Sequence, residues 1–179
     1  MKRAAPLLLF LLGAWSCGTL FMWQTAIQNF AVAEAVASSP HEGLATAADG
    51  LAPGGLRSLV RHQASEVNRL FFSGWGWVQL GLATLAFLLA WVCRCGRVVV
   101  VLIGAMLLIT VALAAYVVPE TVRLGRLMDF AADGSLPQVE GMFWTLHHAY
   151  TSVDMLKFAM GLVAAVIVCR RAIAGLAPA

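Results

Sequence analysis

The sequence predicts an all-α fold, a polytopic membrane four-helix bundle formed by a single domain over residues 1–179. Two observations carry this prediction. The chain is 61% hydrophobic and only 12% charged, whereas soluble domains are about 45–50% apolar and about 25% charged. Four apolar stretches are also long enough to cross a hydrocarbon core of about 30 Å, which takes about 20 helical residues.

The first predicted span covers about residues 7–27. It follows Met1-Lys2-Arg3 and could be mistaken for a signal peptide. Its apolar run is longer than the roughly 7–15 residues of a signal-peptide core, and no small-x-small cleavage site closes it. We therefore expect the segment to be retained as the first membrane helix. The outer loop that follows, about residues 33–56, is rich in Ala, Gly, Ser and Pro, with a short helical piece expected early on.

The second predicted span, about residues 70–92, continues an amphipathic segment that starts at Leu56. Apolar and polar residues alternate there with helical periodicity. The apolar face comprises Leu56, Leu59, Val60, Ala64, Val67, Leu70 and Phe71, and the polar face comprises Arg57, Arg61, Ser65 and Asn68. We expect one helix that extends beyond the outer face of the membrane before it crosses.

The third predicted span, about residues 98–118, follows the second after the tight turn 94–97, so the two helices should be antiparallel neighbours. A helical pattern continues into the second outer loop, about residues 119–140, as far as Phe130. The third helix is therefore expected to extend beyond the outer face, with a kink at Pro119 because proline cannot donate the helical hydrogen bond.

The fourth predicted span, about residues 150–169, belongs to a longer helix. Asp133-Gly134-Ser135-Leu136-Pro137 should end the preceding element, and the last helix is expected to begin just after Pro137 and to reach Arg171. Such a helix is longer than a membrane is thick. The second, third and fourth helices are thus all predicted to extend beyond the outer face.

The positions of the charges predict the orientation. In a four-span chain the N-terminus, the 93–97 turn and the C-terminus lie on one side. That side carries six basic residues and no acidic one: Lys2, Arg3, Arg94, Arg97, Arg170 and Arg171. The positive-inside rule then places both termini in the cytoplasm. We expect a multi-pass protein of the cell membrane, with a bacterial inner membrane as the predicted location.

Lys157 and Asp154 are charges inside a predicted span. Lys157 lies 13 residues before Arg170, or about 20 Å along a helix, so a core of about 30 Å places it about 10 Å below the outer surface. Asp154 lies one turn nearer that surface and can pair with Lys157 at a spacing of three. Charges at such depth usually face the interior of a helix bundle.

A polar network in the outer half is predicted around this pair. His147, Tyr150 and Thr151 extend the same face outward, and Gly161 extends it inward, leaving room for the backbone of a neighbouring helix. Glu66 of the second helix can contact both His62 and Arg69, while Gln24, Gln28, Glu120 and Arg123 are candidates to close the ring. The predicted network comprises His62, Glu66, Arg69, Glu120, His147, Tyr150, Asp154 and Lys157.

Three interpretations of this network stay open. It can be a structural network that fixes helix register, a pocket for a small molecule, metal or cofactor that opens to the outer face, or a docking surface for another membrane subunit. A transport path is disfavoured because the inner half is almost purely apolar, whereas a channel or pump needs polar groups through the whole thickness.

The histidines define a cofactor alternative. Haem b between bundle helices needs two axial histidines in an apolar setting, and His62 with His147 or His148 could supply them at the outer end. Copper could bind at the same histidines. The surroundings of these residues are strongly polar, which weighs against haem. The alternative function is therefore a haem- or metal-binding membrane protein.

No known catalytic motif occurs in the chain, so a non-enzymatic protein is predicted. Twelve Lys and Arg with a net charge of +3 do not support nucleic acid as a partner. Many Gly and Ala residues in the inner half favour close helix packing. We expect the partners to be the lipid bilayer and, as an accessory subunit, other subunits of a larger membrane complex.

Two segments resemble a known family. RHQASEVNR, residues 61–69, precedes an aromatic span, and FWTLHHAYTSVDMLK, residues 143–157, opens the last one. Together they resemble the four-helix membrane domain of unknown function shared with the transmembrane-protein-205-like proteins. The resemblance covers most of the chain and implies a four-helix integral membrane protein, but no established reaction.

Overall fold

The computed structural model describes residues 4–132 and 135–174, and its regular elements over these ranges are all helices. They are α1 (Ala4–Ser38), α2 (Glu42–Ala48), α3 (Gly55–Val92), α4 (Arg97–Ala112), the π-helical turn η1 (Leu113–Val117), α5 (Val118–Met128) and α6 (Pro137–Ala174). Lys2 and Arg3, which entered the orientation argument, and Asp133 and Gly134, which entered the predicted break before the last helix, lie outside the described residues.

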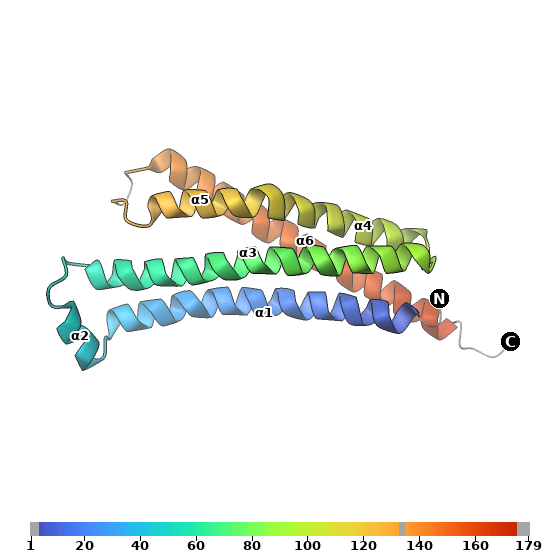
Figure 1. Cartoon of the computed structure of the whole chain (residues 1–179), viewed down its shortest axis with the longest axis horizontal. Coiled ribbons are helices and arrows are strands. Elements are labelled where there is room, and N and C mark those ends of the chain that lie inside the picture. The colour runs from blue at the N-terminus through green and yellow to red at the C-terminus, as the bar shows by residue number, and fades with distance from the viewer. Residues whose placement is uncertain (1–3, 133–134, 175–179) are drawn as a thin grey trace.

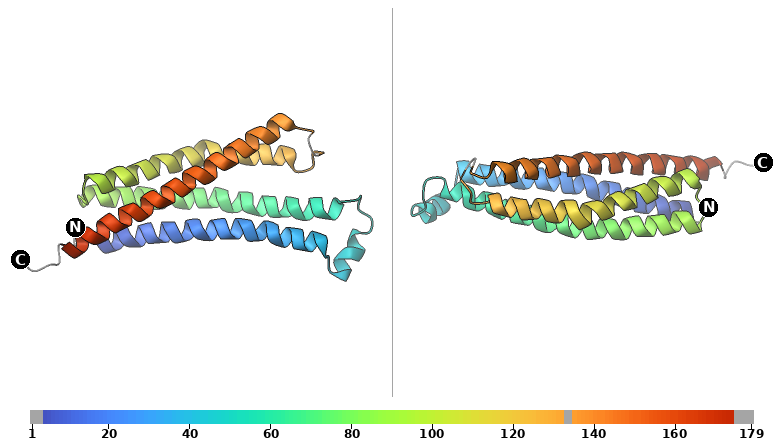
Figure 2. Two further views of the ribbon diagram at one scale, coloured as in Figure 1. Left: turned by 180° about the vertical axis from the view of Figure 1, so that it is seen from behind. Right: turned by 90° about the horizontal axis from the view of Figure 1, so that it is seen from above.

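The long helices form a four-sided bundle (Figure 1). Helix α1 packs against α3 and α6, and α4 packs against the same two helices from the other side. The start of α1 and the end of α6 lie at the same end of the bundle as the turn between α3 and α4, which we call the turn end. The opposite end, called the α2 end, carries α2 and the connection from α5 to α6. Helix α6 runs obliquely across the others, from α5 at the α2 end toward the start of α1 (Figure 2).

Four helices are long and apolar enough to cross a membrane. They are α1, α3, the continuous run Arg97–Met128 formed by α4, η1 and α5, and α6. Helices α3 and α6 each have 38 residues and are about 57 Å long, so both exceed a hydrocarbon core of about 30 Å. The all-helical architecture with four apolar helices confirms the coarse prediction and is compatible with an integral membrane protein.

Helix α1 reaches further into the segment 33–56 than predicted, whereas the helical piece predicted in that segment and the helical continuation predicted after Pro119 are both present. Helix α1 continues to Ser38, α2 occupies part of the same segment, and α5 occupies the start of the segment 119–140. The extension of α1 was not predicted. The stretch from Ala31 to Ala37 is rich in alanine, which has the highest helix propensity, and Asn29 ties this part of α1 to α3 by donating to Ala64 O at 2.8 Å.

The amphipathic prediction for the start of α3 is right about the helix and wrong about Asn68. Asn68 was placed with Arg57 and Arg61 on the polar face, but it is buried and forms hydrogen bonds across the α1–α3 interface. Asn29 Nδ2 donates to Asn68 Oδ1 at 3.0 Å, and Asn68 Nδ2 donates to Ala26 O at 3.3 Å. A buried amide is tolerated because its partners replace the water it loses.

The helix distortion expected at Pro119 lies one turn earlier. Residues Leu113–Val117 form a π-helical turn, and the helix continues through Pro119 into α5. A proline lacks the N–H that would bond to the carbonyl four residues before it, and a wider turn changes the hydrogen-bond register at that point. Thr121 Oγ1 donates to Val117 O at 2.7 Å and stabilises one carbonyl of this turn.

Small residues set the helix spacing at the turn end. Ala83, Ala86 and Ala90 of α3 are fully buried, and Ala164 of α6 is buried in the same way. With Leu8, Ile103 and other apolar side chains, most of these alanines form an almost purely apolar core. The prediction of close packing through small residues is therefore confirmed at Ala83, Ala86 and Ala90, whereas Gly81, Ala112 and Ala115 are exposed.

Candidate functional site

A buried ion pair lies between the helices in the middle of the bundle. Lys157 and Asp154 of α6 are each 1% exposed, and Lys157 Nζ lies 2.7 Å from Asp154 Oδ1. The i,i+3 spacing places both side chains on the face of α6 that is turned toward the bundle. Because isolated charges in an apolar interior are unfavourable by several kcal/mol, the pair depends on further polar partners.

Those partners come from two other helices. Gln79 of α3 accepts hydrogen bonds at Oε1 from Lys157 Nζ and, at 3.0 Å, from Trp15 Nε1 of α1. Trp23 Nε1, two turns along α1, donates to Asp154 Oδ2 at 3.0 Å. Lys157 Nζ also lies 5.7 Å from the centroid of the Trp15 ring, within the range of a cation–π interaction. We call these five residues the buried centre.

Sequence reasoning found the charged members of the buried centre and missed the other three. Gln79 interrupts the second apolar span, and Trp15 and Trp23 are eight residues apart on α1, which returns them to the same face. An amide within a span and two indoles on one face are the signals that could have identified them. Their importance depends on which helices become neighbours, and spacing within one helix does not determine that.

The residues of the predicted polar face of α6 differ in how far they are buried. Asp154, Lys157 and Gly161 are buried, Tyr150 is half-buried with its ring 5.6 Å from that of Phe72, and His147 is exposed. Gly161 was expected to admit the backbone of a neighbouring helix. The nearest atoms to a Cβ placed there are instead side-chain atoms, the Met106 methyl at 3.2 Å and Ser16 Oγ at 3.9 Å. The glycine makes room for a long side chain of α4.

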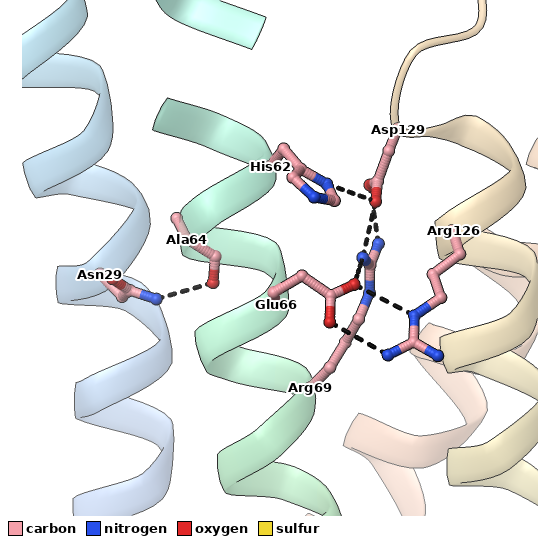
Figure 3. Close-up of polar contacts among 7 residues, drawn as sticks. All are labelled: Asn29, His62, Ala64, Glu66, Arg69, Arg126 and Asp129. Atoms are coloured by element: carbon pink, nitrogen blue, oxygen red, sulfur yellow. Dashed lines mark hydrogen bonds and ion pairs between the residues drawn. The ribbon is translucent and has the colours of Figure 1, made fainter. Parts of the chain in front are cut away.

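A second polar group joins α3 to α5 toward the α2 end (Figure 3). We call it the ion cluster, and it comprises His62, Glu66, Arg69, Arg126 and Asp129. The Arg69 guanidinium donates to both oxygens of Asp129 at 2.7 Å and to Glu66 Oε1 at 2.6 Å. Arg126 donates to both oxygens of Glu66 at 3.0 and 3.1 Å, and His62 Nδ1 lies 2.8 Å from Asp129 Oδ2.

Gly125 makes the close approach of Arg69 possible. A Cβ at this position of α5 would lie 2.9 Å from Arg69 Nη2 and 3.3 Å from the Phe143 ring. The guanidinium therefore lies against the backbone of α5 on its way to Asp129, which follows the last residue of that helix. Glycine at this position and a carboxylate at the end of α5 together hold the largely buried arginine.

The residues predicted as one network thus lie in separate places. His62, Glu66 and Arg69 belong to the ion cluster, whereas Asp154 and Lys157 belong to the buried centre. Glu120 is paired with Arg123 of its own helix at 2.6 and 2.8 Å. The ring of His147 stacks on that of Phe143, and His148 stacks on Trp144. Arg126 and Asp129, which complete the ion cluster, were not among the predicted network residues.

Three side chains of the ion cluster have the composition of a metal site. Ligand atoms of His62, Glu66 and Asp129 all lie within 4.8 Å of one another. The same carboxylates, however, accept hydrogen bonds from Arg69 and Arg126, so two negative charges are matched by two positive ones. A divalent cation would have to displace at least one guanidinium, because the two positive charges repel it.

The ion cluster shifts the acid–base equilibria of its carboxylates. Its residues of α3 precede Leu70, and Arg126 and Asp129 follow Val118, so all of them lie outside the predicted spans 70–92 and 98–118. Hydrogen bonds from Arg126 and Arg69 lower the pKa of Glu66 to about 2. Burial raises the pKa of Asp129, but hydrogen bonds from Arg69 and His62 outweigh it and leave that pKa below its usual value.

We expect the ion cluster to make the fold sensitive to acid. A carboxylate whose pKa is lowered in the folded state stabilises the fold above its unfolded pKa, and this contribution is lost as the pH falls through the folded pKa. For Glu66 the loss should occur between about pH 4.5 and about pH 2. The measurement is the thermal unfolding temperature in detergent from pH 7 to pH 2, for the natural chain and for Glu66→Gln.

The difference in melting temperature between these two proteins should narrow as the pH falls. Glu42→Gln is a matched control, because Glu42 is an exposed carboxylate of α2 without an ion-pair partner among the described residues. A constant difference between the natural chain and Glu66→Gln across this range would show that the Glu66 ion pairs do not stabilise the fold.

Comparison of the chain with protein-family models, with curated proteins and with solved structures finds no match. Its function is therefore inferred from its own residues and their geometry.

Proposed function

We propose that this chain is a non-enzymatic integral membrane protein that acts as an accessory subunit, packed through α1 against a transmembrane helix of another membrane protein. The observation that carries the proposal is a pair of exposed amides on α1, one inside the predicted span 7–27 and one directly after it, where most of the large exposed side chains are apolar. The two amides belong to Gln24 and Gln28, which lie one helical turn apart.

The position of Gln24 follows from its neighbour. Trp23 donates to Asp154 of the buried centre, so Gln24 lies at the same level along α1 and within the predicted span 7–27. Asn29 is bonded to α3, but no hydrogen bond joins the Gln24 or Gln28 side chain to another described residue. Amides that face hydrocarbon without a partner are unfavourable, and in membrane proteins such side chains commonly bond across helix interfaces.

A groove runs beside these amides. It has a volume of about 400 Å³ and is lined from α1 by Gln24, Thr25, Gln28, Asn29 and Val32, and from α3 by Val67 and Phe71. Its lining combines apolar side chains with amides that can both donate and accept hydrogen bonds. This surface is suited to an apolar helix that carries a Ser, Thr, Asn or Gln at the matching level.

The same face of α1 continues toward the turn end with Leu20, which is 48% exposed, and then with two small residues. Gly13 and Cys17 are exposed, and a Cβ at Gly13 would have no heavy atom within 4 Å. Positions 13, 17, 24 and 28 fall within about 60° of one another around a helix of 3.6 residues per turn. Small residues let a second backbone approach closely, and the amides then supply directional bonds.

Site-specific photo-crosslinking in native membranes tests this proposal. A crosslinking residue at position 24 or 28 should capture one partner protein. The same residue at position 108 should not capture it, because Leu108 is 72% exposed on α4, away from this surface. Gln24→Leu with Gln28→Leu should weaken co-purification of the captured partner. A chain that migrates alone after mild solubilisation, or that crosslinks equally from all three positions, would contradict the proposal.

The alternative function is metal binding, and the grouping of His62, Glu66 and Asp129 is the observation that favours it. Zn²⁺ and Cu²⁺ both accept imidazole and carboxylate ligands. Metal analysis of the purified protein should then find a stoichiometric ion that is lost in His62→Ala. Haem between His62 and His147 or His148 stays a prediction, for which an absorption spectrum with a Soret band is the test.

A further inference from the structure

The turn between α3 and α4 is fixed by a side chain of α6. Arg171 Nη1 donates to Cys95 O at 2.6 Å. The guanidinium lies directly on Gly96, where a Cβ would fall 1.6 Å from Arg171 Nη1, and the φ angle of +105° at Gly96 also favours glycine. The end of α6 is thereby held against the turn, and the arginines of both segments lie at the same end of the bundle.

Four arginines lie at this end, and none of them has an ion-pair partner among the residues that the structure describes. They are Arg94 and Arg97 of the turn and Arg170 and Arg171 of α6, which we call the turn-end arginines. The sequence has no Asp or Glu between Met1 and Ala33, between Val67 and Pro119, or after Asp154. No ion pair involves any of the four among the described residues. This contrasts with the α2 end, where Arg57, Arg69, Arg123 and Arg126 all pair with carboxylates.

Exposed apolar side chains flank these cations directly. Ile173, three residues after Arg170 and so on the same face of α6, is 64% exposed, and Val92, the last residue of α3, is 75% exposed. Trp91 of α3 and Val98 of α4 are also exposed. A ligand that contacts both the arginines and these apolar side chains must carry a negative charge next to a long apolar chain.

We propose that the turn-end arginines bind the phosphate of an anionic phospholipid, with its acyl chains lying along these exposed apolar side chains. This inference rests on the proposed location in a membrane. It does not depend on the proposed partner helix or on metal binding. Guanidinium groups bind phosphate through paired hydrogen bonds. An acidic protein segment would satisfy the charge but leave the adjoining apolar surface uncovered, and free phosphate has no apolar part.

The test is lipid binding to the purified full-length chain in detergent, followed by native mass spectrometry. The probes are phosphatidylglycerol and phosphatidylcholine with identical acyl chains, together with inorganic phosphate. We expect phosphatidylglycerol to be retained in preference to phosphatidylcholine. The variant Arg94→Gln/Arg97→Gln/Arg170→Gln should lower the affinity for phosphatidylglycerol by about a hundredfold, at about fivefold for each cation near an anionic headgroup.

Arg171 is left unchanged in this variant because it holds the turn. The matched control, Arg57→Gln/Arg61→Gln/Arg123→Gln, removes the same charge from the α2 end and should retain the preference for phosphatidylglycerol. Equal retention of the two lipids, or an equal loss in the variant and the control, would overturn the proposal. Phosphate that binds as tightly as phosphatidylglycerol would identify a free-anion site and would also overturn it. Circular dichroism of both variants verifies that they are folded.

Discussion

Lys157→Met is expected to lower the free energy of unfolding by about 3–5 kcal/mol, the usual range when one member of a buried ion pair is removed. The substitution leaves the Asp154 carboxylate 1% exposed in the middle of the bundle, with Trp23 as its hydrogen-bond donor. Methionine approximates the volume of lysine, so the loss comes from the stranded charge and not from a cavity. Thermal or denaturant unfolding in detergent micelles measures the change.

The double variant Asp154→Asn/Lys157→Met separates charge from packing. It removes both charges and keeps a hydrogen-bonding group beside Trp23, so most of the lost stability should return. Asp154→Asn alone should also be destabilising, because it leaves Lys157 without its counter-ion. Equal losses in Lys157→Met and in the double variant would show that the two residues do not interact energetically.

Arg69→Met is expected to have the second largest effect, a loss of about 2–4 kcal/mol. Arg69 and Asp129 have side-chain exposures of 13% and 9%, and the two hydrogen bonds between them join α3 to the end of α5. Without the guanidinium, Asp129 keeps only His62 as a partner in this cluster. Unfolding of the purified variant at pH 7 gives the magnitude.

Arg123→Met is the matched control for Arg69→Met. Arg123 has a side-chain exposure of 58% and pairs with Glu120 of its own helix, and exposed pairs of this kind contribute little to stability because water and salt screen them. The two substitutions remove the same group, so the difference between them measures the contribution of burial and of the contact between helices. A loss in Arg123→Met as large as in Arg69→Met would contradict this interpretation.

The two substitutions with the largest expected losses of stability, Lys157→Met and Arg69→Met, both lie at contacts between helices. The buried centre takes Trp15 and Trp23 from α1, Gln79 from α3 and the ion pair from α6, so each hydrogen bond to the pair joins two helices. The ion cluster joins α3 to α5 in the same way. Because a helix that slips by one turn would lose these partners, the two clusters fix the register of the bundle.

The helical architecture could be predicted from the sequence because each membrane helix depends on the hydropathy of its own segment. Each long apolar stretch satisfies its backbone within its own helix, so length and composition suffice to predict four such helices. The helix boundaries were less accurate. The end of α1 at Ser38 and the π-helical turn before Pro119 depend on packing against α3 and on hydrogen-bond register, and neither leaves a simple sequence pattern.

The sequence by itself determined which few charges lie in an apolar segment. Asp154 and Lys157 were found from their depth and their spacing along one helix, and the uneven distribution of acidic residues was visible without coordinates. Only the tertiary structure decided which groups these charges meet. Gln79 and Trp15 lie 64 residues apart and Trp23 and Asp154 lie 131 apart. Periodicity relates residues of one helix, whereas the packing of α1, α3 and α6 sets contacts between helices.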